Sequence, residues 1–216
     1  MSDILLTHGY CIAEDAHEQQ IMKPYPPLGL LYISSYLKER AFDVDLFDMT
    51  FASLAQFQRY LAEKRPRVVG IYCLMMTKFN VLSMMEMCKE AGATIILGGP
   101  EPVNYAREYL ARGADIIVAS EGEETLTELI PHLAANGLTQ LDNIQGIVFE
   151  QDGSPFRTPP RPLQKDLATR PWPDRAAIPL DRYLHTWKTH HGQSSVSLIT
   201  ARGCPYTCKW CSTAVY

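Results

Sequence analysis

Residues 68–101 read VVGIYCLMMTKFNVLSMMEMCKEAGATIILGGPE, and this stretch decides the fold. It predicts a buried strand over Val68–Leu74, rich in β-branched and apolar residues, and another over Thr94–Leu97. Between them, Asn80 is the expected N-cap of a helix that ends near Gly92. Two short buried strands joined by one helix are typical of a parallel sheet with crossover connections.

The same alternation of strand and helix continues on both sides of this stretch and gives five strand–helix units within about the first 135 residues. It predicts an α/β fold with a five-stranded, parallel, doubly wound, Rossmann-like sheet. Ligands of such sheets bind at the carboxyl ends of the strands, so the loops after each strand are the candidate site. The other expected strands are Ile4–Thr7, Val44–Phe47 and Asp115–Ala119, and the other expected helices are Leu28–Arg40, Ser53 to Lys64, Val103–Arg112 and Glu124–Ala135.

After Asn136 the pattern changes. Ile144–Glu150 and Pro155–Thr158 predict a hairpin with its turn at Asp152-Gly153. A proline-rich linker without helical periodicity follows, and Ser194–Thr200 predicts one more strand. We therefore expect a ligand-binding domain over 1–136, a hairpin and linker over 137–192, and the start of another domain over 193–216.

Composition excludes several classes of function. The 216 residues carry a formal net charge of −4 and no Lys/Arg run, so we expect no nucleic-acid partner. No apolar stretch of about 18 residues predicts a membrane span, and the N-terminus lacks the basic flank of a signal peptide, so the expected location is cytoplasmic. In that reducing compartment clustered cysteines indicate metal or catalytic sites, whereas the isolated Cys11, Cys73 and Cys88 are expected to be small buried side chains.

The loop after the first strand, THGYCIAED, excludes two nucleotide sites. It has neither the G-x-G-x-x-G of a dinucleotide site nor the Ser/Thr/Gly-rich loop of a flavin mononucleotide site. A phospho-receiver would have paired acids after the first strand and a lysine after the fifth, where this chain has Thr7-His8-Gly9 and Ser120-Glu121-Gly122. The glycine pair follows the fourth strand instead, at Gly98-Gly99, where it serves either a tight turn or the close approach of a ligand to the backbone.

Three cysteines, Cys204, Cys208 and Cys211, form a C-x-x-x-C-x-x-C motif near the end of the chain. A structural zinc site needs four ligands, and His190 and His191 lie at no common finger spacing from this motif. Three thiolates can hold a 4Fe-4S cluster with one iron left open to a ligand, and open coordination is what metal chemistry requires.

The segments YPPLGLLYISSYLKERAFDVDLFD, VVGIY, ILGGPE and ASEGEETLTELI occur in this order over residues 3–135. Together they resemble the cobalamin-binding domain found at the N-terminus of many radical S-adenosylmethionine enzymes, and ARGCPYTCKWC resembles the cluster motif of that superfamily. The resemblance implies that cobalamin lies across the carboxyl ends of the strands. It implies the following contacts: Gly98 and Gly99 against the nucleotide tail, Tyr72, Cys73 and Thr77 beside it, Glu121 and Gly122 near the corrin edge, and Trp210 against the adenine of S-adenosylmethionine.

Some cobalamin domains carry D-x-H-x-x-G, whose histidine binds cobalt from below. Here Asp15-Ala16-His17 matches the first part, but Gln20 replaces the glycine. His17 is therefore either a cobalt ligand or a solvated loop residue.

The resemblance also implies an activity. The cluster, supplied with electrons by a donor such as flavodoxin or ferredoxin, would cleave S-adenosylmethionine to a 5′-deoxyadenosyl radical, for methyl transfer to an unactivated carbon or for ring closure. A non-catalytic corrinoid-binding module with a zinc-binding or vestigial tail is the alternative. Because a (β/α) barrel is much longer than the segment after Ser194, we expect a truncated radical S-adenosylmethionine domain that is inactive alone.

Overall fold

The structure is a computed structural model that describes residues 2–164, 166–204, 206 and 208–209. Its centre is a seven-stranded sheet in the order β2-β1-β3-β4-β5-β6-β7. The first five strands are parallel, as the sequence predicts, and the last two are antiparallel. The strands are β1 Ile4–His8, β2 Val44–Phe47, β3 Val68–Tyr72, β4 Thr94–Gly98, β5 Ile116–Val118, β6 Ile147–Gln151 and β7 Ser154–Arg157.

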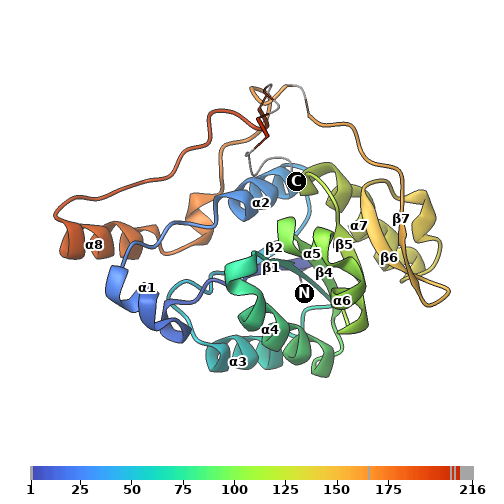
Figure 1. The fold of residues 1–216 in the computed structure, drawn as a ribbon, viewed down its shortest axis with the longest axis horizontal. Coiled ribbons are helices and arrows are strands. Elements are labelled where there is room, and N and C mark those ends of the chain that lie inside the picture. Colours follow the sequence, from blue (N-terminus) through green and yellow to red (C-terminus); the bar gives the residue numbers. More distant parts are fainter. Residues whose placement is uncertain (1, 165, 205, 207, 210–216) are drawn as a thin grey trace.

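Helices cover both faces of the sheet, as Figure 1 shows. The α-helices are α1 Ala16–Ile21, α2 Leu28–Glu39, α3 Leu54–Lys64, α4 Lys78–Glu90, α5 Pro100–Asn104, α6 Ala106–Ala111, α7 Gly122–Asn136 and α8 Leu180–His191, and the short 3₁₀ turns are η1 Ile12–Glu14, η2 Met75–Thr77, η3 Leu141–Asn143 and η4 Arg175–Ala177.

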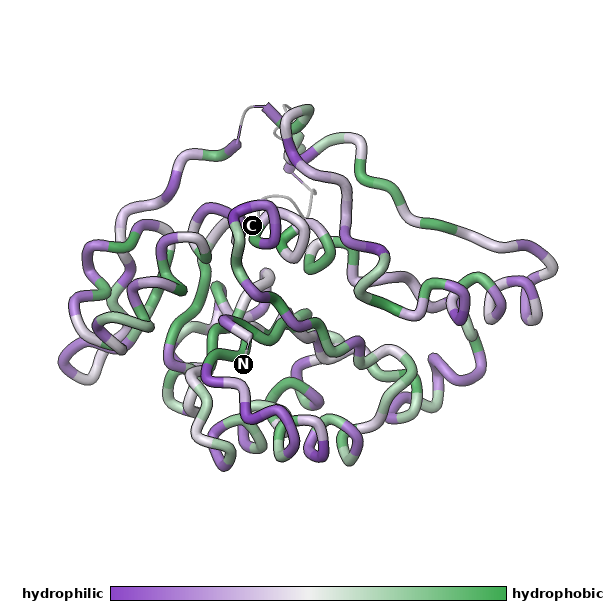
Figure 2. The backbone as a smooth tube through the Cα atoms, turned by 180° about the vertical axis from the view of Figure 1, so that it is seen from behind, coloured by the Kyte–Doolittle hydropathy of each residue, from purple (hydrophilic) through white to green (hydrophobic). Residues whose placement is uncertain are grey.

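Successive strand residues point to opposite faces and build two cores. Leu5, on β1, packs in the core under α3, α4 and α6, whereas its neighbours Ile4 and Leu6 pack in the core under α2 and α7. All three are almost fully buried. Figure 2 shows the result as a hydrophobic centre surrounded by helices with hydrophilic outer turns. Burial on both faces explains why these strands are continuously apolar.

Most element boundaries follow from local signals. Ser53 caps α3 in a full capping box with Gln56, as expected. The expected cap at Asn80 is wrong, because α4 begins at Lys78 directly after η2, and the Asn80 amide instead donates to the Gly9 carbonyl at 3.0 Å. The expected single helix over 103–112 is two short helices, because the backbone leaves the helical region at Tyr105.

The hairpin is confirmed, with Asp152 and Gly153 both at positive φ as a tight two-residue turn requires. Its first strand, β6, pairs antiparallel with β5, so the hairpin extends the sheet.

Two expectations about the last third of the chain are wrong. Residues 180–191, expected as linker, form α8, which begins after Pro179 and ends at Gly192 in the left-handed region. The proline-rich stretch before α8 favours a linker, although Tyr183 and Trp187, four residues apart, lie on one face of the helix. The expected strand Ser194–Thr200 does not form, because no neighbouring strand pairs with it. No helix in the described part of the chain is long and apolar enough to cross a membrane.

Candidate functional site

The strand order reverses between β1 and β3, and the loops that follow β1, β3 and β4 meet there. Tyr72 and Gly98, the last residues of β3 and β4, are partners in the parallel register. The Cys73 amide donates to the Gly98 carbonyl at 2.8 Å and continues this pairing into the loops. The structure therefore brings together Tyr72, Cys73, Gly98 and Gly99, four of the residues that the sequence predicts to contact cobalamin.

The two glycines of this edge have different reasons to be glycine. Gly99 has φ +99°, and a Cβ there would lie 2.4 Å from the Cys73 carbonyl oxygen and about 3.0 Å from the Tyr72 ring. Gly98 has no such constraint, since a Cβ on it would meet no atom within 4 Å. The fold thus accounts for Gly99, whereas Gly98 borders open space at the ends of the strands.

Large apolar side chains are exposed beside this space. Met75, Met76 and Phe79, in the loop after β3 and the first turn of α4, are 63%, 81% and 74% exposed, and Tyr105 after α5 is 52% exposed. Exposed apolar groups that gather on one edge of a domain indicate a surface that binds something. The loop with Met75, Met76 and Phe79 is among the loops that the sequence predicts for the site, whereas sequence reasoning missed Tyr105.

Cys73 and Thr77, also predicted near cobalamin, face inward. The Cys73 thiol is fully buried and lies 3.4 Å from the Tyr109 hydroxyl. Burial, only partly offset by that hydrogen bond, raises the pKa of Cys73 to about 11. The Thr77 hydroxyl closes η2 through the Leu74 amide and carbonyl. These two side chains shape the loop, and their backbone is what a ligand at this edge could reach.

A buried polar network lies at the carboxyl ends of β1 and β2. His8 Nε2 lies 3.1 Å from Asp48 Oδ1, and the Tyr10 amide donates to His8 Nδ1, so the proton sits on Nε2. The Tyr183 hydroxyl, from α8, lies 2.7 Å from both Asp48 Oδ2 and Thr50 Oγ1. Burial disfavours the charge on Asp48, but the hydrogen bonds from His8, Tyr183 and the Thr50 amide outweigh it and lower the pKa of Asp48. Sequence reasoning missed this network because its members come from three distant segments.

His17, the expected candidate for a cobalt ligand, is exposed on α1. The Asp15 carboxylate accepts hydrogen bonds from the amides of His17 and Glu18, so the Asp-x-His pattern here is a helix N-cap. Figure 1 shows α1 well separated from β4 and α5. The role of His17 as a ligand stays a prediction.

Glu121, in the loop between β5 and α7, and Gly122, the first residue of α7, are the residues predicted near the corrin edge. Glu121 accepts a hydrogen bond from the Gln164 amide at 2.9 Å, which ties the linker to this loop. Arg202 pairs with Glu121 at 3.2 Å and with Glu123 at 2.5 Å. Gly122 begins α7, where a Cβ would lie 2.9 Å from a methyl group of Ile33.

The cysteine motif is only partly described. Cys204 and Cys208 are exposed, whereas Cys11, Cys73 and Cys88 are buried as expected. Cys211 and Trp210 lie outside the described residues. Within the ranges that the structure describes, no group of three or more His, Cys, Asp or Glu side chains could hold a metal ion.

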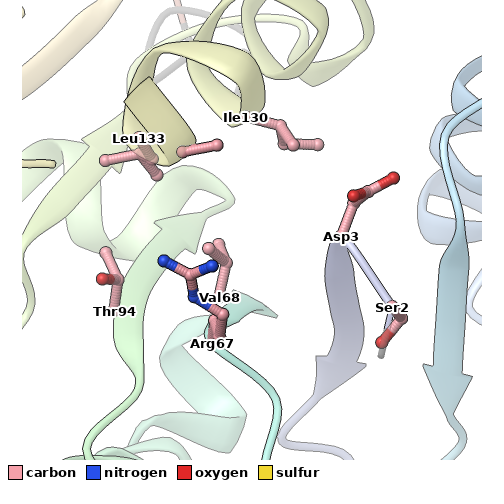
Figure 3. A pocket seen from close by; sticks show the side chains of 8 residues that line it. Ser2, Asp3, Arg67, Val68, Thr94, Ile130 and Leu133 are labelled. Atoms are coloured by element: carbon pink, nitrogen blue, oxygen red, sulfur yellow. The ribbon is translucent and has the colours of Figure 1, made fainter. Parts of the chain in front are cut away.

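A small hollow of about 190 Å³ lies at the opposite edge of the sheet. Asp3, Arg67 and Thr94 line it at the amino ends of β1, β3 and β4, and Ile130 and Leu133 of α7 cover it (Figure 3). Because ligands of doubly wound sheets bind at the carboxyl ends, this hollow is not part of the candidate site.

Named relatives match this chain over most of its length. An uncharacterized methyltransferase, PH0819, from Pyrococcus horikoshii is 28% identical over 212 residues, which cover 94% of this chain and 44% of that protein. An anaerobic magnesium-protoporphyrin IX monomethyl ester cyclase from Synechocystis sp. is 28% identical over 196 residues, covering 86% of this chain and 38% of the cyclase. The chain thus spans less than half the length of these relatives.

A solved structure of OxsB, a cobalamin-dependent S-adenosylmethionine radical enzyme with aqua-cobalamin bound, has a similar fold. It matches with a TM-score of 0.61 and 24% identity, over 74% of this chain and 22% of OxsB. At this identity the match shows a shared fold. Residues 20–130 match the family described as "B12 binding domain". Because that match takes in more than half of the 216 residues, the chain belongs to the B12 binding domain family.

Proposed function

We propose that this chain binds cobalamin across the carboxyl edge of its sheet and forms the front part of a cobalamin-dependent radical S-adenosylmethionine enzyme that transfers a methyl group to an unactivated carbon. The observation that carries the proposal is the open space beside Gly98, since nothing in the fold requires glycine there. Family membership supports the same ligand.

The residues present fit cobalamin. Gly98 lets the nucleotide tail approach the backbone of β4, and Gly99 holds the neighbouring loops close together. Met75, Met76 and Phe79 offer an apolar surface to one face of the corrin and exclude water from it. Both ring nitrogens of His8 are occupied by Asp48 and Tyr10, so that side chain stabilises the edge.

Cys204, Cys208 and Cys211 would hold a 4Fe-4S cluster, and Trp210 would contact S-adenosylmethionine. Exposed thiols are available as thiolate ligands, as cluster assembly requires. When bound, cobalamin would supply the methyl group, and the cluster would supply the electron that cleaves S-adenosylmethionine. An electron donor such as flavodoxin or ferredoxin would reduce the cluster.

A ring-closing activity is the second candidate, because three matched relatives are named as cyclases. A corrinoid module with a zinc-loaded tail is the third. Anaerobic reconstitution with iron and sulfide separates the third from the others. Bound iron with visible absorption that disappears in Cys208→Ala supports the enzyme, whereas stoichiometric zinc without iron supports the module.

A graded series at Gly98 tests the cobalamin site itself. Calorimetric titration with hydroxocobalamin should show affinity falling from Gly98 to Gly98→Ala to Gly98→Leu. The leucine should cost about tenfold or more, as expected when a side chain occupies ligand space at about 1–3 kcal/mol. Ala62→Leu, which adds a similar volume to the exposed surface of α3, should bind like the wild type. Equal affinity for Gly98→Leu and wild type would refute the site.

A further inference from the structure

The segment after α8 returns to the sheet and is fastened to the loop between β5 and α7. Arg202 Nη1 donates to Glu121 Oε1 at 3.2 Å, and Nη2 donates to Glu123 Oε1 at 2.5 Å. One guanidinium therefore bridges two carboxylates, and its planar fork of donors suits this better than a lysine would.

This contact differs from an ordinary surface ion pair. The side chain of Glu123 is 6% exposed, and in the part of the chain that the structure describes Arg202 supplies the only hydrogen bond to its carboxylate. A buried carboxylate is costly unless it is paired, so the site calls for a cation at this point. The side chain of Glu128, which pairs with Arg161, is 50% exposed, and its carboxylate has no such requirement.

The contact of Arg202 with the two glutamates lies close in sequence to the cysteine motif. Glu121 and Glu123 flank Gly122, the first residue of α7, at the carboxyl edge of β5. Arg202 stands two residues before Cys204 in the sequence. Figure 1 shows the segment after α8 running back above α2.

Other contacts bring the same segment to this place. Arg175 Nη2 donates to the Ser197 carbonyl at 2.6 Å, and the Ser194 hydroxyl donates to the Leu184 carbonyl at 3.1 Å. These contacts hold the beginning of the segment, and Arg202 holds its end. Without regular structure between them, the position of Cys204 depends on the Arg202 contact.

We propose that Arg202 is a positioning residue whose contact with Glu121 and Glu123 fixes the start of the cysteine loop, at Cys204, near the beginning of α7, so that the iron–sulfur and cobalamin sites lie at a set distance from each other. The statement about the two cofactors rests on the proposed function. The statement about the loop does not, and it can be tested without either cofactor.

Spin-label distances test the loop. A nitroxide on Cys208, in a Cys204→Ser/Cys211→Ser background, is paired with a second on Glu63→Cys of α3. The three buried cysteines should stay unlabelled. Wild-type Arg202 should give one narrow distance distribution, and Arg202→Glu and Arg202→Gln should broaden it at least twofold. The exchange Arg202→Glu/Glu123→Arg should narrow it again.

Arg161→Glu is the matched control. It breaks the ion pair of Arg161 with Glu128, on the same helix α7, and should leave the distribution unchanged. Arg202→Gln guards against misfolding caused by a reversed charge. A distribution as narrow in both Arg202 variants as in the wild type would overturn the proposal.

Electron paramagnetic resonance tests the consequence for the cofactors. In chain loaded with cob(II)alamin and a reduced cluster, the cluster should speed the relaxation of the cobalt signal. Arg202→Glu should remove this effect while iron content and cobalamin affinity change less than twofold. Unchanged coupling in Arg202→Glu would refute the cofactor part. If the wild type binds neither cofactor, the proposed function fails, and the spin-label result still decides the role of Arg202.

Discussion

Replacing Gly99 by alanine should destabilise the fold, and the structure gives the size of the effect. A residue other than glycine at φ +99° costs about 1–3 kcal/mol in backbone strain. The added Cβ would lie 2.4 Å from the Cys73 carbonyl oxygen, a backbone atom that must move, at about 1–3 kcal/mol for overpacking. Alanine also lowers the conformational entropy of the unfolded chain, which offsets about 0.4–1 kcal/mol of this loss. The net loss should therefore be about 3 kcal/mol.

Urea denaturation followed by circular dichroism measures this loss directly. Gly98→Ala is the matched control, because its Cβ meets nothing within 4 Å and its φ is not positive. That variant should stay within about 0.5 kcal/mol of the wild type. If Gly99→Ala lost no more stability than Gly98→Ala, the close approach of the two loops could not be the reason for the glycine.

Other predictions concern the buried network and the thiols. Tyr183→Phe removes two hydrogen bonds between α8 and the loop after β2 and should lower the free energy of unfolding in urea by about 1–3 kcal/mol. Substitution of the exposed Tyr25 by Phe should change it very little. Because the pKa of Asp48 is lowered in the fold, its contribution is present above the unfolded pKa of about 3.9 and is lost as pH falls through the folded pKa. The difference in free energy of unfolding between wild type and Asp48→Asn should therefore become smaller in acid. A difference that does not change with pH would contradict this. A thiol reagent at mildly alkaline pH should modify Cys204 and Cys208 quickly and leave Cys88 intact, because burial raises the pKa of Cys88 to about 12. Mass spectrometry showing early modification of Cys88 would be inconsistent with its burial.

Local signals made the parallel sheet predictable. The apolar runs of β1 to β5, the capping box at Ser53 and the Asp152-Gly153 turn each follow from a few neighbouring residues. The same signals placed Tyr72, Gly98 and Gly99 together, because carboxyl ends of parallel strands share an edge.

Contacts between distant segments were not predictable. Tyr183 reaches Asp48 across 135 residues, and Arg202 reaches Glu123 across 79. Because no periodicity in the sequence predicts such pairings, the sequence predicts a linker where α8 forms, and it does not predict the contact of Arg202. The predicted strand Ser194–Thr200 failed for a related reason, since an apolar run becomes a strand only beside a partner.

Hydroxyl-radical footprinting with hydroxocobalamin tests the site most directly. Met75 and Met76 are exposed at the carboxyl edge, and Met87, on α4, packs against the core away from it. Saturating cobalamin should slow oxidation of Met75 and Met76 severalfold relative to Met87. Equal oxidation of all three with and without cobalamin would contradict the claim that the corrin covers this edge.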